Sequence, residues 1–435
     1  MRKLRDSGLP WLKEIPCNWK NETIRHLMVS RDGGVWGEEP KDESSGTICL
    51  RIADFDYSRG RFKKCSDEDL TRREYTKSQL SRLSLKAGDI LVEKSGGGEK
   101  TPVGRSVYYG GEYGPVLFAN FMERLRFDTT RIDPEYAEYW LRAWYACRCS
   151  SYYINQTTGI QNINLTLMLA KERIFYPSFS EQRKIIDYLD KRCGELDCVI
   201  TDIQAQIATL EQYKRSVITE TVTKGLNPDA EMKDSGIQWV GQMPLTWDAV
   251  PNKYLMYKVK NICPVYNGED ILSLTTNGVI IRDLNGGGKM PISFDGYQKV
   301  TPGNLLMCLF DIDVTPRCIG LVKNFGLTSP AYSQFVMRTG AYAPYYYYYY
   351  LMVDYTKELL HMAKNLRHSL TEDQLGAIKA PNPPYEEQVQ IAEFLDKKCV
   401  EISRVIEDKN KQLATLDEYK KSLIFEYVTG KKEVI

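Results

Sequence analysis

The chain has 435 residues, of which 43% are hydrophobic and 26% charged, the balance of a soluble globular protein. This length is too great for one ordinary core and predicts more than one domain. The formal net charge is +1, so a role in nucleic-acid binding would require locally clustered basic residues or partner subunits that also hold the duplex.

Several classes of protein are disfavoured by the same composition. No apolar run approaches the roughly 20 residues of a membrane span, and the first residues are polar rather than signal-like. The 11 cysteines are scattered without a C-x-x-C pair, and only 3 histidines are present, so we expect no metal site. Many free cysteines without a secretion signal indicate the reducing cytoplasm.

A short segment near the start of the chain returns in the second half. Residues 6–19 read D-S-G-L-P-W-L-K-E-I-P-C-N-W, and residues 234–247 read D-S-G-I-Q-W-V-G-Q-M-P-L-T-W. The offset is 228 residues, and the Asp-Ser-Gly, both tryptophans and the second proline are shared. A repeat of this kind predicts two related modules.

The segment that follows, residues 20–176, is predicted to be the first variable domain. It contains L-K-A-G-D-I-L at 85–91 and a predicted helix that begins at Pro134. Basic residues crowd one stretch of it: Arg51, Arg59, Arg61, Lys63, Lys64, Arg72, Arg73, Lys77, Arg82 and Lys86. We interpret this basic cluster as a surface that contacts phosphates, with an ordinary solvated face as the alternative.

Two loops of the first domain carry residue types that contact nucleic acids. Residues 95–101 read S-G-G-G-E-K-T and lack the spacing of a phosphate-binding loop, so they form either a hairpin turn or a loop whose backbone approaches phosphate. Residues 157–165 read T-T-G-I-Q-N-I-N-L. Their amide and hydroxyl side chains suit base reading, although turns use the same residue types.

Residues 181–223 are predicted to form one long helix, since they contain a single glycine and no proline. They match residues 387–429 without a gap, with 22 identities in 43 positions. The apolar residues of the first copy follow a heptad pattern at Leu196, Ile200, Ile203, Ile207, Leu210 and Val217. The second copy keeps the pattern at Ile402, Ile406, Leu413, Leu416 and Leu423, with Lys409 in one apolar position.

A helix of this length, roughly 65 Å at 1.5 Å per residue, cannot stand alone in water. Its own copy is the simplest partner, and we predict that the two helices pair antiparallel. The alternative is that each helix packs only on its own domain.

The second variable segment, residues 248–380, shares faint landmarks with the first. V-T-P-G-N-L-L at 300–306 parallels the first domain's L-K-A-G-D-I-L, and Pro344 parallels Pro134. Residues 345–350 are six tyrosines, which face all directions of a helix, so we expect most to serve packing rather than base stacking. The glycine-rich run at 285–289 is open to the same two interpretations as residues 95–101.

One motif suggests an enzyme. Residues 382–385 read N-P-P-Y, the motif with which N6-adenine methyltransferases hold a flipped base. At the helix offset of 206 these residues align with 176–179, a plain junction between a domain and a helix. No glycine-rich cofactor loop that follows a strand lies at a suitable distance upstream, so we predict that the chain has no catalytic residues.

Taken together, these features resemble the specificity subunits of Type I restriction–modification systems over essentially the whole chain. The resemblance rests on the duplicated S-G-x-x-W segments, the two P-x-x-x-E-Q-x-x-I-x-x-x-L-D helix starts, and the Y-K-x-S at Tyr213 and Tyr419. The G-D-I-L at 88–91 and the stretch 157–165 also look like landmarks of that family. The second domain departs from the pattern with G-N-L-L and N-L-R-H-S-L-T.

The resemblance implies an α+β fold. It consists of two mixed α/β target-recognition domains separated by two long antiparallel coiled-coil helices, with a pseudo-twofold internal repeat. Each domain would read one half of a split target in double-stranded DNA, and the helices would set the spacer. The implied partners are two methyltransferase subunits and, in the full complex, restriction and translocase subunits. S-adenosylmethionine, ATP and Mg would belong to those partners, and this chain would hold no cofactor.

We therefore divide the chain into four segments: residues 1–178, the leading segment and first recognition domain; 179–227, the first spacer helix; 228–383, the second leading segment and recognition domain; and 384–435, the second spacer helix. The predicted DNA contacts are Arg51, Arg59, Arg61, Lys63, Lys64, Lys100, Arg105, Gln156, Thr157, Thr158, Gln161, Asn162, Asn164, Lys289, Arg317, Lys364, Asn365 and Arg367.

Three other functions remain open on the sequence alone. One is the specificity chain of a bifunctional cutting-and-methylating system without a motor subunit. Another is a stand-alone adenine methyltransferase, and a third is a coiled-coil scaffold without a role on DNA.

Overall fold

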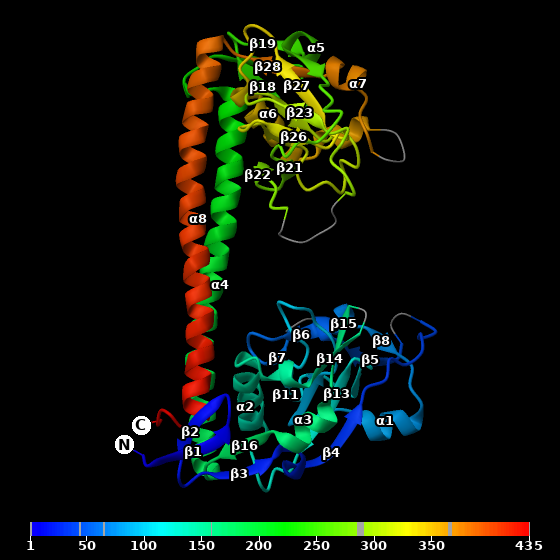
Figure 1. The fold of residues 1–435 in the computed structure, drawn as a ribbon, viewed down its shortest axis with the longest axis vertical. Coiled ribbons are helices and arrows are strands. Elements are labelled where there is room, and N and C mark those ends of the chain that lie inside the picture. The colour runs from blue at the N-terminus through cyan, green and yellow to red at the C-terminus, as the bar shows by residue number, and fades with distance from the viewer. Residues whose placement is uncertain are drawn as a thin grey trace. The chain divides into compact units, whose positions relative to one another are not determined.

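The computed structural model describes residues 2–42, 45–63, 66–157, 159–284, 291–363 and 368–434 (Figure 1). They form two compact units. The first unit contains residues 1–203 together with 411–435, and the second contains residues 204–410. Strands and helices are mixed in both units, which confirms the α+β class.

An antiparallel four-stranded sheet, ordered β11-β9-β13-β4, forms the centre of the first unit. Its strands are β4 (Met28–Gly33), β9 (Asp89–Glu93), β11 (Ser106–Tyr109) and β13 (Met122–Phe127). β9 is buried along its whole length. Helix α2 (Pro134–Ala146) packs on β11, with Asp133 as its cap and Pro134 in its first turn, so the predicted helix start is confirmed.

The first unit also contains smaller elements. The paired strands are β1 (Leu4–Leu9) with β2 (Leu12–Pro16), β3 (Lys20–Thr23) with β16 (Arg173–Tyr176), β6 (Phe55–Asp56) with β7 (Arg61–Phe62), β12 (Val116–Phe118) with β5 (Thr47–Leu50) and β8 (Arg72–Arg73), and β10 (Ser95–Gly96) with β15 (Ile160–Ile163) and β14 (Ile154–Thr157). The short helices are α1 (Lys77–Leu83) and α3 (Leu165–Lys171).

The second unit also has a four-stranded antiparallel sheet with one helix packed on an edge strand. Its antiparallel sheet has the order β20-β27-β24-β25, with strands Met256–Val259, Ser333–Met337, Leu305–Met307 and Ile319–Leu321, and α6 (Ala343–Tyr355) packs on β25. The other elements are β17 (Met232–Asp234), β18 (Gln242–Pro244), β19 (Asp248–Pro251), β21 (Leu272–Thr275), β22 (Gly278–Ile281), β23 (Gln298–Val300), β26 (Gly326–Thr328), β28 (Lys379–Asn382), α5 (Asn252–Leu255) and α7 (Glu372–Ala377).

The six consecutive tyrosines lie on α6 and serve packing, as predicted. Five of them are buried, and Tyr347 is half-buried. Their hydroxyls find partners in the same unit: Tyr345 donates to the Val222 carbonyl at 3.0 Å and Tyr348 to Asp396 Oδ1 at 2.6 Å. A buried hydroxyl with a partner avoids the cost of desolvation, which allows so many tyrosines in one core.

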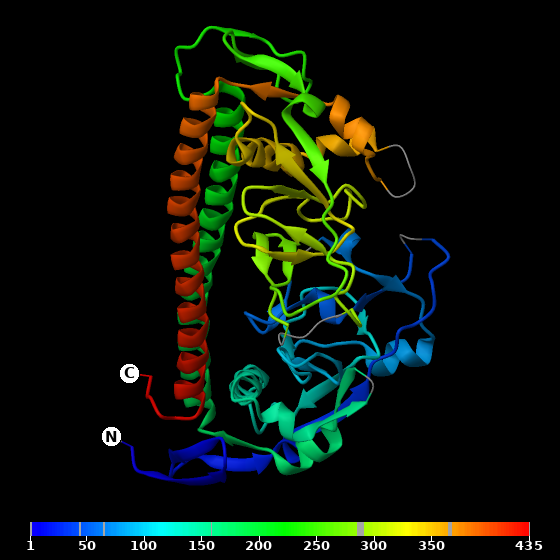
Figure 2. The ribbon, with the colours of Figure 1, turned by 45° about the horizontal axis from the view of Figure 1, so that its top comes forward.

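The two long helices are α4 (Phe179–Lys224) and α8 (Tyr385–Val428), close to their predicted bounds. In the first unit, Tyr427 of α8 donates a hydrogen bond to Tyr188 of α4 at 3.1 Å. In the second unit, Lys214 of α4 donates to Ser403 of α8 at 2.8 Å. In each unit the early part of one helix therefore lies beside the late part of the other, in antiparallel orientation (Figure 2).

The heptad positions predicted from the sequence face inward. Every one of the eleven apolar seam residues is buried or half-buried, and so is Lys409. Lys409 places its ammonium on the side-chain oxygen of Gln206. The seam thus accommodates one charged residue by giving it a polar partner across the helix pair.

The duplication persists in individual contacts. Trp19 meets Tyr136 edge-on at 6.4 Å between ring centroids in the first unit, and Trp247 meets Tyr345 in the same way at 6.4 Å in the second. A glycine lies against each of these tryptophans with a positive φ, 72° at Gly430 and 77° at Gly225. A Cβ atom would crowd the indole in both places. The same packing constraint therefore requires a glycine just after the end of each long helix.

A glutamine at the start of each long helix joins it to its domain. Gln182 accepts from the backbone N–H of Asp133 at 2.9 Å and donates to the Pro177 carbonyl at 3.0 Å. Gln388 makes the same pair of bonds, with the Tyr342 N–H at 2.8 Å and the Pro383 carbonyl at 2.8 Å. Both glutamines are buried, so this junction fixes the helix entrance in each unit.

Candidate nucleic-acid interface and partner surface

The predicted base-reading stretch folds into the hairpin of β14 and β15, which also pairs with β10. Gln161 is buried, and its side-chain oxygen accepts from the Val103 N–H at 3.2 Å. Asn164 caps α3 by accepting from the Leu167 N–H at 3.1 Å. These two side chains therefore hold the hairpin in place.

Asn162, in the same hairpin, is exposed. Its side-chain oxygen accepts a hydrogen bond from the Ser95 hydroxyl at 2.5 Å. It remains a predicted base contact. The side chains of Gln156 and Thr157, and residue Thr158 as a whole, lie outside what the structure describes.

The glycine-rich run at 95–101 makes a tight turn after β10, where the Gly98 N–H donates to the Thr101 carbonyl at 2.9 Å. Gly97 has a φ of +67°, and a Cβ atom there would lie 2.6 Å from the Val103 nitrogen. Packing alone therefore requires glycine at position 97. The corresponding run at 285–289 lies outside the described residues.

Two predicted DNA-contacting arginines are anchored by buried or half-buried carboxylates. Arg105 reaches Glu93 through Nε at 2.9 Å and Nη2 at 2.6 Å, and its guanidinium lies 3.5 Å from the ring centroid of Tyr57. Arg61 lies 2.9 Å from Glu135 and also approaches the fully buried Glu138 at 3.7 Å. Sequence alone could not show these pairings, because the carboxylates lie 12 or more positions away in the chain.

The rest of the predicted basic cluster is also largely matched by carboxylates. Ion pairs join Arg51 to Asp54, Arg59 to Asp56 and Asp197, Arg73 to Glu39, and Arg82 to Asp32. The Lys63 ammonium donates to the Ala53 carbonyl at 2.6 Å. Lys64 lies outside the described residues, and Lys77, Lys86 and Lys100 are exposed. As DNA contacts, all of these residues stay predictions.

In the second unit the structure describes only one predicted DNA contact, Arg317. Its guanidinium donates to the Thr276 carbonyl at 2.7 Å, to the Ile319 carbonyl at 3.1 Å and to the Tyr347 hydroxyl. The other predicted contacts, Lys289, Lys364, Asn365 and Arg367, lie outside the described residues.

The N-P-P-Y motif occupies the domain-to-helix junction, as its alignment with residues 176–179 predicted. The Asn382 side-chain oxygen accepts from the Tyr346 hydroxyl at 2.7 Å and from Gln388 at 3.2 Å. The Pro383 carbonyl accepts from the same glutamine. The polar groups that a methyltransferase would turn toward a base are here used to attach α8.

One buried carboxylate has an unusual environment. Glu138 on α2 is fully buried, and neither of its oxygens has a hydrogen-bond partner among the described residues. Burial raises its pKa to about 7, although Arg142 and Arg61 act in the opposite direction. Each of these guanidiniums lies 3.7 Å from it.

The long helices carry exposed apolar residues at matched positions, which the heptad analysis missed. At the helix offset of 206, Phe179 corresponds to Tyr385, Val199 to Val405 and Tyr213 to Tyr419. All six are between 42% and 52% exposed. The valine and tyrosine pairs are identical in the two copies although 21 of the 43 positions matched between 181–223 and 387–429 differ, so these exposed apolar residues point to a surface used twice.

No group of three or more His, Cys, Asp and Glu side chains in the described part is placed to hold a metal ion. None of its helices combines the length and the apolar character that crossing a bilayer requires.

Two known proteins are similar to this chain in sequence. No protein-family profile matches it. A candidate MjaX type I restriction enzyme specificity subunit of Methanocaldococcus jannaschii is 24% identical over 448 aligned residues, covering 97% of this chain and 95% of that protein. The MjaVIII type I restriction enzyme specificity subunit of the same organism is 25% identical and covers 65% of this chain and 68% of its own length. Over nearly its whole length the chain is therefore similar to a type I restriction enzyme specificity subunit.

A solved structure has the same fold as this chain. It describes complex assembly and conformational transition of the type I restriction–modification system, and one of its chains superposes with a TM-score of 0.68. The match covers 96% of this chain and 99% of that chain at 13% identity, so it shows a shared fold and no more.

Proposed function

We propose that this chain is the sequence-specific DNA-recognition subunit of a type I restriction–modification complex. Each unit would read one half of a split target through its own variable domain. One observation carries the proposal: the same junction and helix-end contacts recur in both units, whereas the segments between them have diverged. A duplicated frame with unlike inserts fits a reader of two different half-sequences.

The chain itself would perform no bond chemistry. The only motif that suggested catalysis is used to attach α8, and the relatives are named as specificity subunits. S-adenosylmethionine, ATP and Mg would then act on partner subunits. Sequencing the methylated bases of the host DNA tests the proposal: a split motif should be methylated when this gene is present and unmethylated when it is deleted. Methylation that persists after deletion would contradict it.

The paired helices would act as the spacer between the half-sequences. One heptad adds about 10 Å of helix at 1.5 Å per residue, the rise of about three base pairs. Inserting one heptad at the same level of both helices should therefore lengthen the gap in the methylated motif by up to about three base pairs. Unchanged half-sequences with an unchanged gap would rule out the spacer role.

The matched apolar positions would dock two methyltransferase subunits, one on each copy. Val199→Glu places a charge in one copy of that surface, and Val405→Glu does so in the other. We expect each single variant to lose one methyltransferase subunit from the purified complex and the double variant to lose both, measured by native mass spectrometry. Lys184→Glu with Gln390→Glu is the control, because these exposed positions are matched but not apolar. Full assembly of the double valine variant would contradict the docking role.

A further inference from the structure

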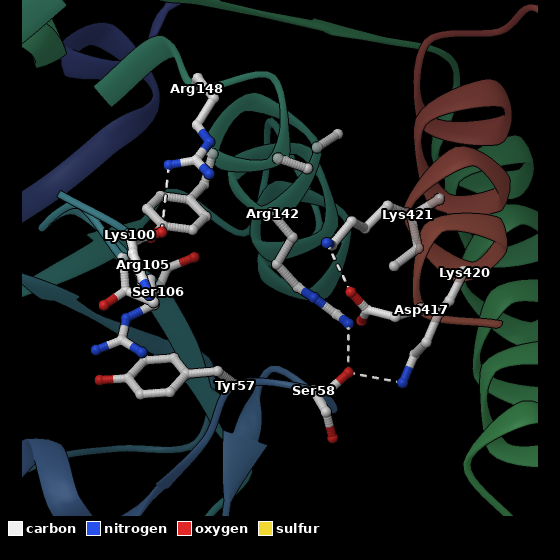
Figure 3. A pocket seen from close by; sticks show the side chains of 15 residues that line it. Tyr57, Ser58, Lys100, Arg105, Ser106, Arg142, Arg148, Asp417, Lys420 and Lys421 are labelled. Atoms are coloured by element: carbon white, nitrogen blue, oxygen red, sulfur yellow. Dashed lines mark hydrogen bonds and ion pairs between the residues drawn. The ribbon is translucent and has the colours of Figure 1, made fainter. Parts of the chain in front are cut away.

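A cavity of about 360 Å³ lies in the first unit, between α2, two loops of the recognition domain and the late part of α8 (Figure 3). Six of the side chains that line it are cationic: Lys100, Arg105, Arg142, Arg148, Lys420 and Lys421. Asp417 is the one carboxylate named among the lining residues. The volume falls in the range of small-ligand sites.

Part of this positive charge is balanced from within the unit. Glu93 neutralises Arg105, the buried Asp197 pairs with Lys420, and Asp417 lies 2.6 Å from Lys421. The Ser58 carbonyl accepts from both Arg142, at 2.8 Å, and Lys420, at 2.7 Å. The bonds of Arg142, Lys420 and Lys421 hold the side of the cavity formed by α2 and α8 in a defined shape (Figure 3).

Two cations on the opposite wall of the cavity are not neutralised in this way. Lys100 and Arg148 are exposed, and neither has a carboxylate partner among the described residues. They are joined only through the Arg148 guanidinium, which donates to the Lys100 carbonyl at 3.4 Å. Arg148 also has a left-handed backbone with a φ of +60°, an unfavourable conformation for a residue with a side chain.

A buried hydroxyl lies in the same wall. Ser106 is 5% exposed, and its Oγ has no hydrogen-bond partner among the described residues. Figure 3 shows it beside Lys100 and Arg105 in the cavity wall. A buried hydroxyl without a partner is unfavourable, so a ligand that accepts a hydrogen bond there would gain from it.

The second unit serves as an internal control for these cations. Matched contacts of α2 and α6 align Tyr136 with Tyr345 and Tyr139 with Tyr348, an offset of 209. At that offset Arg142 becomes Leu351, and Arg148 becomes Lys357. Lys357 has the same left-handed backbone, with a φ of 53°, but its ammonium lies 2.8 Å from Asp354. The shared frame therefore forms with a paired cation at the position of Arg148.

We propose that the cavity of the first unit binds a phosphate group, held by Arg148 and Lys100 and by a hydrogen bond from the Ser106 hydroxyl. Arginine, lysine and hydroxyl donors together match the several acceptor oxygens and the charge of phosphate. The phosphate comes either from the DNA backbone or from a free phosphate compound. Only the DNA source rests on the proposed function.

Calorimetric titration of inorganic phosphate into the full-length chain tests the site. We expect Arg148→Ala and Ser106→Ala each to weaken phosphate binding at least tenfold. Lys41→Ala, an exposed cation elsewhere in the unit, should stay within twofold of wild type. Melting of each variant in phosphate-free buffer shows whether it is folded, and the exposed Arg148 supplies a variant in which folding should be unaffected.

A second measurement distinguishes the two sources. In the assembled complex, a DNA phosphate in the cavity predicts that Arg148→Ala lowers the salt dependence of duplex binding by about one ion, without changing the sequence preference. If the source is free phosphate, Arg148→Ala weakens phosphate binding at least tenfold and leaves the salt dependence of duplex binding as it was. If wild type binds no phosphate and Arg148→Ala leaves the salt dependence unchanged, the site is refuted. A wild-type complex that binds no duplex would refute the proposed function, and the phosphate titration would still decide the cavity.

Discussion

The two units fill the same frame with different chemistry. In the first unit, Asp197 of α4 pairs with Lys420 of α8, and both side chains are buried. The matched positions in the second unit hold Ser403 and Lys214, which meet through a neutral acceptor at 2.8 Å. The helix pair therefore requires a polar partner for the lysine at this level and does not require a charged one.

The domain helices α2 and α6 show the same contrast between charged side chains in the first unit and neutral ones in the second. α2 carries Glu138 and Arg142, whereas the matched positions of α6 carry Tyr347 and Leu351. The first unit is thus the ionic copy and the second the aromatic copy. This contrast predicts that equal substitutions at matched positions have unequal effects.

The largest difference is expected at the lysines of the helix seam. Lys420→Met removes the partner of a buried carboxylate, which typically costs about 3–5 kcal/mol. Lys214→Met leaves only a serine hydroxyl and should cost about 1 kcal/mol or less. Denaturant unfolding followed by tryptophan fluorescence measures both. Equal losses would remove the distinction between the two copies.

A smaller effect depends on pH. The pKa of Glu138 is about 7 in the folded chain and near 4.5 in its ordinary state, so only the folded state keeps the proton between these values. Its contribution to stability therefore falls as pH rises from about 4.5 to 7 and is constant above, a loss on the order of 3 kcal/mol.

Glu138→Gln should flatten this part of the stability profile and stabilise the chain more at pH 8 than at pH 5. Unfolding curves of wild type and variant across this range provide the measurement. A parallel shift of the whole profile would show that the carboxyl group does not titrate there.

The smallest effect concerns the leading segments. Trp239 donates its indole N–H to the Tyr349 hydroxyl at 3.0 Å in the second unit, whereas the indole N–H of the matched Trp11 in the first has no partner among the described residues. Tyr349→Phe should therefore cost about 1 kcal/mol. Trp140 occupies the matched position on α2 and has no hydroxyl to remove. A neutral Tyr349→Phe would indicate that both indoles are satisfied in another way.

The repeated parts of the fold were the predictable parts. Helix bounds, the antiparallel pairing and the role of the tyrosines followed from a gapless repeat and a heptad pattern, because helix periodicity is local in the sequence. The environments of Arg105 and Gln161 were not predictable. They depend on which strands become neighbours, as when Glu93 of β9 meets Arg105 next to β11. The cavity likewise unites α2 with residues of α8 that lie more than 250 positions away in the chain.

The most direct test of the two-reader account is an exchange of domains. Residues 20–176 are replaced by the corresponding segment of another specificity subunit, and the methylated motif is read by sequencing DNA from cells that carry the hybrid. The account predicts that one half of the motif changes to that of the donor, while the other half stays as in the parent. A motif in which both halves change, or neither, would contradict it.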